Sequence, residues 1–520
     1  MALGKYFSKD LLAIHKVIST SPDLLEEKLN NTVVGIAFDK NAIETLEGQK
    51  CLDLLIRLLS RFYPVLKIIN LSEGQKNYVE LKLSILAKKI NSNISLVGKE
   101  VTESILIVVG KTEAEIETTA ETFFLGSDNW LSYFSQNKSK SFSNSSNPFG
   151  CGFSAILAAS NIFRNIFHDE LNGSDIDEDL TFSTFSLEKN NVENPPLEEV
   201  FFEDVVIAGL GAIGNGLIWG LANFPNLSGN LDLVDPESIA LTNLQRYVML
   251  TENQENQWKA EISPSFFPQP KLKVKGYTKS WDKYSLERNK WKIDCVAVGV
   301  DNIKDRIGIQ SSLPKVLLNA FTEPETVGLS RHYDFVEYAC LVCSNIPLSK
   351  IPSYLENIAE SCKIPEHIFL LRQYYDNNIS VDQIIIGNSI NLLNLIGIAN
   401  KISEEQLKPF HGMYVQQFYG EFICGGQILK MTNSTTQELD HVDAPLAFQS
   451  AMAGLLLAIE VIRYNIKQPR LTQRTDFYPL AAISSLNPLH RSIEKDVTGK
   501  CICVDSDFLA RYKSKYIPSK

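Results

Sequence analysis

The chain has 520 residues, 44% of them hydrophobic and 21% charged, which is typical of a globular protein with about two to four domains. Its 50 basic and 61 acidic residues give a net charge of −11, which argues against a nucleic-acid partner. The first residues lack a signal peptide's apolar stretch, and the nine cysteines are irregularly spaced, so we expect reduced thiols and a cytoplasmic protein.

Residues 1–168 are predicted to form a first domain of alternating strands and helices. The pattern predicts a short apolar strand at 32–38, an amphipathic helix at 51–62 and another buried strand at 104–109. The next segment, 169–199, is acidic, rich in Ser and Asn, and contains a Pro-Pro pair. This composition predicts a linker or a long surface loop.

A second α/β unit is predicted to begin at residue 200. A strand at 205–208 leads through a glycine turn into a helix, and further strands are predicted at 231–234 and 295–300. Such alternation predicts an α/β fold with Rossmann-like, mostly parallel and doubly wound sheets.

The second unit is predicted to be interrupted. Its first part, 200–344, is followed by a mainly helical insertion at 345–430 and by a second part at 431–490. Within the second part, 444–462 is apolar enough to resemble a membrane span, but it contains Gln and Glu, so we expect a buried helix and no membrane partner. The tail, 491–520, is basic at its end and fits either a docking element or disorder.

The two halves of the chain resemble each other. Residues 155–164 match 454–463 at a constant offset of 299 positions (454 − 155), and the strand before Gly110 matches the strand before Gly299. The first half has no glycine turn and has Thr112 where the second half has Asp301. If the halves are duplicates, we expect the first to be a scaffold.

The glycine turn carries a nucleotide-binding signal. Gly209, Gly211 and Gly214 follow a strand and open a helix, so backbone N–H groups can approach a phosphate at the positive end of that helix. Asp235 lies 21 residues after Gly214 (235 − 214), where a dehydrogenase places an acidic residue for a ribose hydroxyl. The glycine turn and Asp235 therefore fit both ATP and a nicotinamide cofactor as the ligand.

The residues after the turn separate these two interpretations. They comprise an acidic pair, an Asn-Leu-Gln-Arg segment, a lysine 13 positions after the arginine (259 − 246) and an Asp-Asn pair: Asp235, Glu237, Asn243, Arg246, Lys259, Asp301 and Asn302. This set resembles the ThiF/MoeB/HesA adenylating superfamily, which includes ubiquitin-activating enzymes and bacterial activators of the thiamine and molybdopterin pathways. The resemblance directly covers about 200–345 and 430–465, and it implies that 1–168 is an inactive adenylation-like domain.

The resemblance implies that the chain uses ATP and Mg²⁺. Asp235 would hold the ribose, and Asp301 would hold the metal ion. The expected nucleotide contacts are Gly209, Gly211, Gly214, Asp235, Glu237, Asn243, Arg246, Lys259 and Asn302. A peptide carboxylate would attack the α-phosphorus without a general base, because it is already ionised at neutral pH. Arg246 and Asp301 would thus act by positioning and electrostatics.

Cys424 is the candidate nucleophile for a second step. It precedes Gly425-Gly426 at the end of the insertion, where the glycines leave room for an extended peptide tail. Cys-Gly-Gly resembles the thioester site of bacterial stand-alone activating enzymes for ubiquitin-like proteins, a group that suggests antiviral conjugation. A buried structural cysteine is the alternative interpretation.

Other cysteines suggest a metal site less strongly. Cys340-x-x-Cys343 resembles half of a zinc clamp, but a four-thiolate site needs a second pair. Only Cys362 or Cys501-x-Cys503 could supply it, and Cys-x-Cys is not the expected spacing, so zinc is predicted to be unlikely. The remaining thiols, Cys51, Cys151 and Cys295, lie in apolar runs and are interpreted as core residues.

Three arginines of the first half raise a further possibility. Related enzymes send an arginine from the inactive half or a second subunit to the ATP phosphates, and the candidates here are Arg57, Arg61 and Arg164. The sequence selects none of them, and solvated helix faces are the default interpretation for all three.

The sequence therefore predicts an ATP- and Mg²⁺-dependent activating enzyme for a ubiquitin-like protein, which would form a thioester on Cys424 and deliver the protein to a separate conjugating enzyme. A homodimer is the expected assembly. The alternatives are an enzyme that adenylates a peptide or sulfur-carrier tail without a thioester, a nucleotide-binding scaffold without chemistry, and a nicotinamide-dependent oxidoreductase.

Overall fold

The computed structural model describes most of the chain, and the statements below concern only the described residues. Left out are residues 1–3, 7–9, 11–12, 15–16, 19–20, 73–77, 172–174, 190–191, 288–291, 346–366, 368–370, 372–373, 375–376, 387–389, 396–402, 424–444, 482–487 and 518–520. Contacts divide the chain into a main body (1–4, 29–346 and 447–520) and a second body (5–28 and 347–446).

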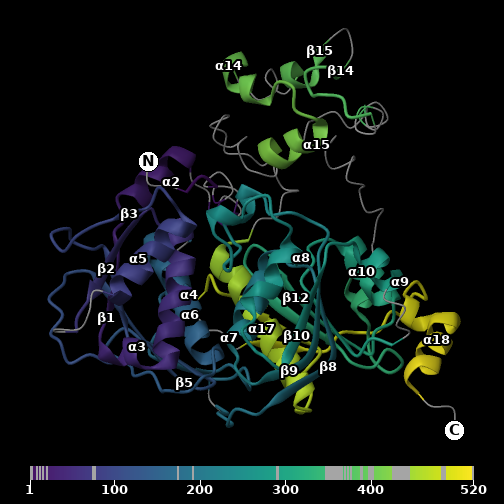
Figure 1. Ribbon diagram of the computed structural model, residues 1–520, viewed down its shortest axis with the longest axis horizontal. Coiled ribbons are helices and arrows are strands. Elements are labelled where there is room, and N and C mark those ends of the chain that lie inside the picture. Colours follow the sequence, from purple (N-terminus) through teal and green to yellow (C-terminus); the bar gives the residue numbers. More distant parts are fainter. Residues whose placement is uncertain are drawn as a thin grey trace. The chain divides into compact units, whose positions relative to one another are not determined.

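The first half of the main body contains a seven-stranded sheet (Figure 1). Across the sheet the strands are β3 (Ser95–Leu96), β2 (Val65–Asn70), β1 (Val34–Phe38), β4 (Ile105–Val109), β5 (Glu121–Asp128), β6 (Leu131–Ser135) and β7 (Leu180–Ser183). The first five run parallel, and β6 and β7 are added antiparallel. Every residue of β1 (VGIAF) and of β4 (ILIVV) is buried, as expected of strands covered on both faces.

The second half repeats this order in an eight-stranded sheet. Its strands are β10 (Leu272–Tyr277), β9 (Leu227–Val234), β8 (Val200–Ala208), β11 (Cys295–Val298), β12 (Val316–Thr322), β13 (Val327–His332), β16 (Arg474–Phe477) and β17 (Leu489–Arg491). Again the first five are parallel and the rest antiparallel. Two Rossmann-like units with one topology confirm the predicted α/β fold and the internal repeat.

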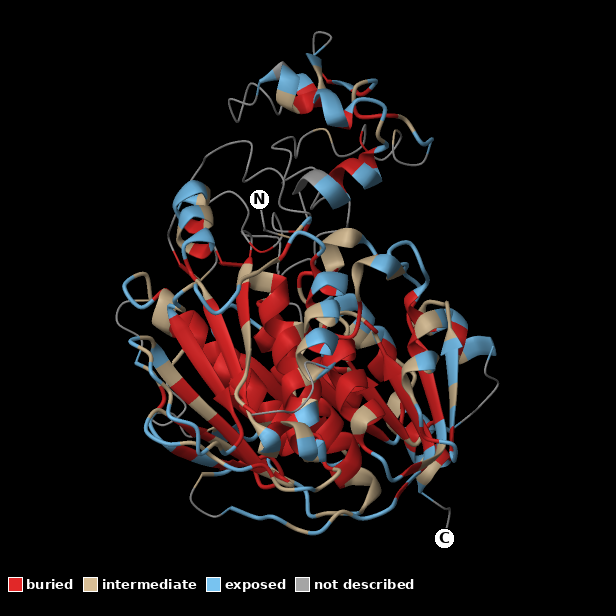
Figure 2. Ribbon diagram, turned by 60° about the vertical axis from the view of Figure 1, so that its left-hand side comes forward, coloured by how far each residue is buried: buried red, intermediate tan, exposed pale blue. Residues whose placement is uncertain are grey.

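Helices between the two sheets join the halves (Figure 1). The main-body helices are α3 (Lys40–Glu44), α4 (Leu46–Phe62), α5 (Tyr78–Ile90), α6 (Phe149–Ile166), α7 (Ala212–Asn223), α8 (Lys259–Ile262), α9 (Trp281–Glu287), α10 (Ile303–Ser311), α17 (Ala447–Asn465) and α18 (Ser506–Tyr516); α2 (Pro22–Asn30) begins in the second body. The helices α4, α6, α7 and α17 pack on one another in the middle, where Figure 2 shows the densest burial.

The close packing of α7 on α17 explains the small residues of the predicted repeat. A Cβ atom on Gly454 would lie 2.3 Å from the backbone oxygen of Ile213 and 2.6 Å from the Cα atom of Gly216. Among the described helices, α17 is the one long and apolar enough to cross a membrane, and nearly all of it is buried inside the protein. Its burial agrees with the predicted core helix.

Two predicted boundaries differ from the structure. The acidic segment 169–199, expected to be a linker, contains β7, and Asp177 is buried in an ion pair with Arg164. The tail 491–520 contains α18, in which the Tyr516 hydroxyl donates to the backbone oxygens of Ile293 and Leu313 at 3.0 and 3.1 Å. Tertiary contacts therefore order segments whose composition predicted loops or disorder.

The described parts of the second body contain short elements. They are the helices α14 (Glu404–Leu407) and α15 (Val415–Phe418), the π-helix Tyr419–Ile423, and the antiparallel strands β14 (Ile385–Ile386) and β15 (Ile390–Asn391). The insertion at 345–430 thus includes a small sheet beside its predicted helices.

Candidate nucleotide site

The glycine turn lies between β8 and the start of α7. Gly209 has a φ of +92°, and a Cβ atom there would lie 2.8 Å from Val300, so this turn requires glycine. Gly214 packs against the turn, since its Cβ atom would lie 2.3 Å from the Gly209 oxygen. Gly211 is different. A Cβ atom on Gly211 would have the Tyr247 hydroxyl oxygen as its nearest neighbour, at 3.4 Å, so there is open space above the helix N-terminus.

The N-terminus of α7 has the properties of an anion site. Gly211 is its N-cap, and no side chain caps the helix. The first N–H groups of a helix lack partners within the helix, and the helix dipole places partial positive charge there. A phosphate at this end would satisfy both the backbone donors and the local electrostatic field.

Asp235 is tied to the glycine turn. Its carboxylate accepts hydrogen bonds from the Leu210 N–H at 2.8 Å and from the Glu237 N–H at 2.9 Å. Burial raises the pKa of Asp235, although Lys259 and these two N–H groups act in the opposite direction. The acidic residue predicted at the end of β9 therefore lies beside the phosphate-binding turn.

Lys259 is buried at the centre of the predicted cluster. Its Nζ lies 2.5 Å from Oε2 of Glu237, 3.1 Å from the Tyr247 hydroxyl and 4.0 Å from Oδ1 of Asp235. Burial lowers the pKa of Lys259, but Tyr247, Asp235 and Glu237 together raise it above its usual value. Burial raises the pKa of Asp235, and the attraction of Lys259 offsets that effect only in part.

Arg246 has a buried side-chain nitrogen that no described residue satisfies. Its Nη1 is buried, and it has no hydrogen-bond partner among the residues described. Its guanidinium lies 5.6 Å from the ring centre of Tyr247, whose hydroxyl contacts Lys259. A buried guanidinium donor is costly unless an acceptor satisfies it, and a triphosphate would supply one.

Tyr247 was missed in the sequence analysis. It follows Arg246 directly, and aromatic residues after such a segment give no nucleotide signal of their own. The structure places its hydroxyl near the open side of Gly211 and its ring 5.2 Å from Nζ of Lys259.

The remaining predicted residues have different surroundings. Asp301 is exposed after β11 and forms no hydrogen bond or ion pair within the described part of the chain, which suits a carboxylate that would hold Mg²⁺. Asn302 is the N-cap of α10 and accepts from the Asp305 N–H at 2.7 Å, so its observed role is structural. Asn243 accepts from the Ala240 N–H at 3.0 Å through its side-chain oxygen.

The corresponding edge of the first sheet is closed by its own side chains. The Thr112 hydroxyl donates to Asp39 at 2.8 Å, and Oδ1 of Asn41 accepts from the N–H groups of Lys111 and Phe142 at 3.1 and 2.8 Å. Polar groups that would meet a nucleotide in the second half therefore bond to one another here. This supports the prediction of a scaffold half.

The three arginines of the first half are engaged with protein groups. Arg61 and Arg164 are fully buried, which corrects the expectation of solvated helix faces. Arg164 pairs with Asp177 inside the first half. Arg57 and Arg61 donate to backbone oxygens of 247–250 in the second half.

Four thiols meet at a second site, which contradicts the argument that the Cys-x-Cys spacing disfavours a four-thiolate set. The Sγ atoms of Cys340, Cys343, Cys501 and Cys503 all lie within 4.8 Å of one another. The hydrogen-bonded pairs are 3.3 to 3.5 Å apart, close to the roughly 3.8 Å that tetrahedral Zn–S bonds of about 2.3 Å impose. The Cys-x-Cys spacing fits because a short 3₁₀ turn at Ile502–Val504 brings both of its thiols to the same cluster.

Cys424, the predicted nucleophile, and Cys362 lie outside the described residues. Cys51, Cys151 and Cys295 are buried free thiols, as predicted, and burial raises the pKa of each.

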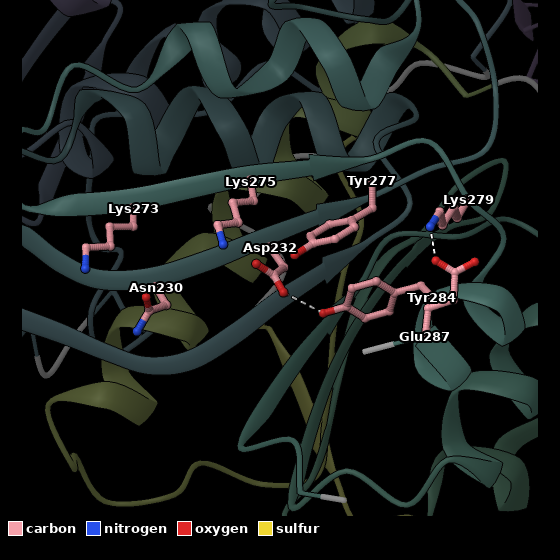
Figure 3. A pocket seen from close by; sticks show the side chains of 8 residues that line it. All are labelled: Asn230, Asp232, Lys273, Lys275, Tyr277, Lys279, Tyr284 and Glu287. Atoms are coloured by element: carbon pink, nitrogen blue, oxygen red, sulfur yellow. Dashed lines mark hydrogen bonds and ion pairs between the residues drawn. The ribbon is translucent and has the colours of Figure 1, made fainter. Parts of the chain in front are cut away.

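A basic cavity of about 350 Å³ lies on the edge strands of the second sheet (Figure 3). Lys273 and Lys275 project from β10 into it, and neither has a hydrogen-bond or ion-pair partner in the described part of the chain. At its base the Tyr284 hydroxyl donates to Asp232 at 2.8 Å. The cavity holds none of the predicted site residues.

The fold and the cluster around Lys259 place the chain in a class of α/β proteins with two Rossmann-like units, of which the second carries a glycine turn with open space at a helix N-terminus. Residues 180–492 match the ThiF family, and residues 37–168 match the family described as Prokaryotic E2 family C. The chain belongs to the ThiF family and is an adenylating enzyme. The region 37–168, predicted to be an inactive adenylation-like domain, has the topology of the adenylation unit but matches an E2 family.

A similar protein is known along the whole length. The uncharacterized protein y4jF of Sinorhizobium fredii is 33% identical over 521 residues, which cover 99% of this chain and 98% of that protein.

Solved structures show a more distant likeness. E. coli MccB with MccA-N7isoASN is 16% identical, with a TM-score of 0.35, over 58% of this chain and 67% of that one. The microcin C7 biosynthetic enzyme MccB in complex with N-formylated MccA is 15% identical, with a TM-score of 0.34, over 59% and 67%. At these values the likeness carries no inference about the substrate of this chain.

Proposed function

We propose that the chain activates a ubiquitin-like protein by adenylating its C-terminal carboxylate. One observation carries this proposal: the buried Nη1 of Arg246 has no partner among the described residues and belongs to the same cluster as the uncapped N-terminus of α7. A nucleoside triphosphate fits both features, because its phosphate oxygens accept hydrogen bonds from the guanidinium and from the helix N–H groups.

In the proposed first step, a carboxylate oxygen of the partner forms a bond to the α-phosphorus of ATP. The bond from that phosphorus to the bridging oxygen breaks, and the electron pair leaves with pyrophosphate. Arg246 and the α7 N–H groups hold the phosphates, and Lys259 stabilises the charge that develops on them. Asp301 would hold Mg²⁺, which neutralises charge on the leaving pyrophosphate.

In the proposed second step, the Cys424 thiolate attacks the acyl carbon and AMP leaves, which gives a thioester. The Cys-Gly-Gly sequence and the resemblance to ubiquitin-activating enzymes support this step. The match of 37–168 to a prokaryotic E2 family supports a ubiquitin-like partner. A separate conjugating enzyme, a homodimer, an antiviral pathway and a cytoplasmic location remain part of the proposal.

Pyrophosphate exchange tests the first step. The wild-type chain with ATP and a ubiquitin-like partner should incorporate labelled pyrophosphate into ATP, and Asp301→Asn should lower that rate by about a hundredfold or more. Lys304→Ala, an exposed change on the neighbouring helix, is the matched control and should keep the rate. No exchange with any acceptor polypeptide would refute the proposal.

A reductant-sensitive adduct tests the second step. Cys424→Ala should lose the adduct between enzyme and partner but keep pyrophosphate exchange, whereas Cys362→Ala, in the same insertion, should keep both. Exchange without any adduct in the wild type would instead identify an enzyme that adenylates a peptide or sulfur-carrier tail and stops there.

We also propose that the four-cysteine cluster holds a structural zinc ion. Cys340 and Cys343 follow β13, while Cys501 and Cys503 precede α18, so the ion would fasten the C-terminal helix to the second sheet unit.

A further inference from the structure

One face of α4 contacts the active half along much of its length. Lys50, Asp53, Arg57 and Arg61 follow one another at intervals of three and four residues, which places them on one side of a helix. Toward the start of this row, Nζ of Lys50 donates to the backbone oxygen of Asn223 at the end of α7, at 2.9 Å.

The middle of the row contacts both α7 and a loop of the active half. Oδ2 of Asp53 accepts from Nε1 of Trp219 at 3.0 Å and from Nε of Arg57 at 2.8 Å. Arg57 in turn donates through Nη1 to the backbone oxygens of Val248 and Met249, at 3.0 and 3.2 Å. The ion pair thus orients the Arg57 guanidinium toward the loop.

Arg61 completes the row in a buried position. It is only 1% exposed, and its Nη2 donates to the backbone oxygens of Tyr247 and Leu250, each at 2.6 Å. Together the two arginines bind four successive carbonyls, 247–250. Burying a guanidinium is costly, and here it provides directed donors that fix one short loop.

The same loop is held from the other side by the helix of the glycine turn. Oδ1 of Asn215 accepts from the Met249 N–H at 3.2 Å, and its Nδ2 donates to the backbone oxygens of Leu210 and Gly211 at 2.9 and 3.0 Å. The loop 247–250 therefore connects α4 of the inactive half to the phosphate-binding turn.

Side chains at the start of this loop lie in the nucleotide site. The backbone oxygen of Tyr247 is bound by Arg61, whereas its hydroxyl lies 3.1 Å from Nζ of Lys259 and faces the open side of Gly211. The preceding residue is Arg246, whose Nη1 has no hydrogen-bond partner in the described part of the chain. A shift of the loop would move Arg246 and would move the Tyr247 hydroxyl away from Lys259.

We propose that Arg57 and Arg61 are positioning residues of the nucleotide site. They act through the backbone of 247–250 on Tyr247, and through it on Arg246 and Lys259, without contacting the nucleotide themselves. The inactive half then contributes to ATP binding by fixing a loop of the active half. This inference rests on the proposed function, because it requires ATP at the open site.

ATP affinity, measured by calorimetry on the full-length chain without an acceptor, tests the inference. Arg61→Met should weaken ATP binding by about tenfold to a hundredfold, because small misplacements of binding groups are costly. Lys50→Met is the matched control: it lies on the same face of the same helix and also binds a backbone oxygen, but at the far end of α7. It should leave ATP affinity within about twofold, even where it lowers the melting temperature.

A double-mutant cycle separates positioning from a general structural role. If Arg61 acts through Lys259, then Arg61→Met should add little to the loss caused by Lys259→Ala. Where Arg61→Met does not fold, Arg61→Lys and Tyr247→Phe replace it in the cycle. Additive losses, or equal losses for Lys50→Met and Arg61→Met, would overturn the inference. A wild type that binds ATP without pyrophosphate exchange would refute only the proposed function.

Discussion

Replacing Glu47 by Gln should stabilise the protein at alkaline pH and not at acidic pH. Glu47 is fully buried at the start of α4. Its carboxyl group accepts from the Asn129 N–H at 2.7 Å, from the Ser143 hydroxyl at 2.8 Å and from the Ser127 hydroxyl through a short contact. Burial is the main cause that raises its pKa from 4.5 to about 7, and these three hydrogen bonds offset it only in part.

The magnitude follows from proton linkage. Below pH 4.5 the Glu47 carboxyl group is protonated in both the folded and the unfolded chain. Its favourable contribution to the free energy of unfolding is then fully present. As pH rises toward 7, the unfolded chain loses this proton before the folded chain does, and the contribution disappears. A shift from 4.5 to about 7 corresponds to about 3 kcal/mol. Gln resembles the protonated acid, because it keeps one acceptor and has a neutral NH₂ group that can donate to Ser127.

The assay is urea unfolding of both chains at pH 5, 6, 7 and 8. The stability of Glu47→Gln relative to the wild type should increase by about 2.5 kcal/mol between pH 5 and pH 8, while other titrating groups cancel in the comparison. A difference that does not change with pH, or that falls, would refute the assignment of a raised pKa to Glu47. A multi-domain chain can unfold in several steps, so the transition that involves the first sheet unit is the one compared.

Two further changes test the metal and nucleotide sites. Cys503→Ser should reduce the zinc content, measured by mass spectrometry, from one ion per chain to almost none. Cys295→Ser, at a buried thiol outside the cluster, is the control and should keep the zinc ion. Equal zinc contents in the two variants would refute the site. Gly214→Ala should weaken ATP binding by more than about tenfold, because its Cβ atom would lie 2.3 Å from the Gly209 oxygen, while Gly308→Ala, which meets nothing within 4 Å, should not. Unchanged affinity in the Gly214 variant would contradict the turn geometry.

The fold was largely predictable because the spacing of apolar residues along the chain indicates which faces of a strand or helix are buried. Strands buried on both faces, such as Ile105–Val109 and Cys295–Val298, are nearly continuous apolar runs, and both were predicted. The repeat was predictable because the close approach of α7 and α17 restricts side-chain size at Gly454. Residues 180–183 were not predicted as a strand, because their pairing with β6 depends on a partner distant in sequence.

The proximity of the candidate site residues was predictable where their spacing along the chain is short. The turn at Gly209–Gly214 and the cation pair Arg246 and Lys259 carry their spacing in the sequence. The proposed positioning role of Arg61 could not be predicted from the sequence. It depends on backbone carbonyl groups almost 190 residues away, and every residue has such a group. The four-cysteine cluster was predicted to be unlikely because of its Cys-x-Cys spacing. Cys343 and Cys503 are separated by 160 positions, and only the folded chain brings them together.

The duplication places both halves of the enzyme on a single polypeptide. The inactive half, whose helix α4 binds the carbonyl groups of residues 247–250, is covalently attached to the active half. Its local concentration therefore does not fall on dilution. One half was therefore free to lose its ligand site while it kept the surface that its neighbour needs. The contact between α4 and residues 247–250 should therefore persist on dilution of the protein.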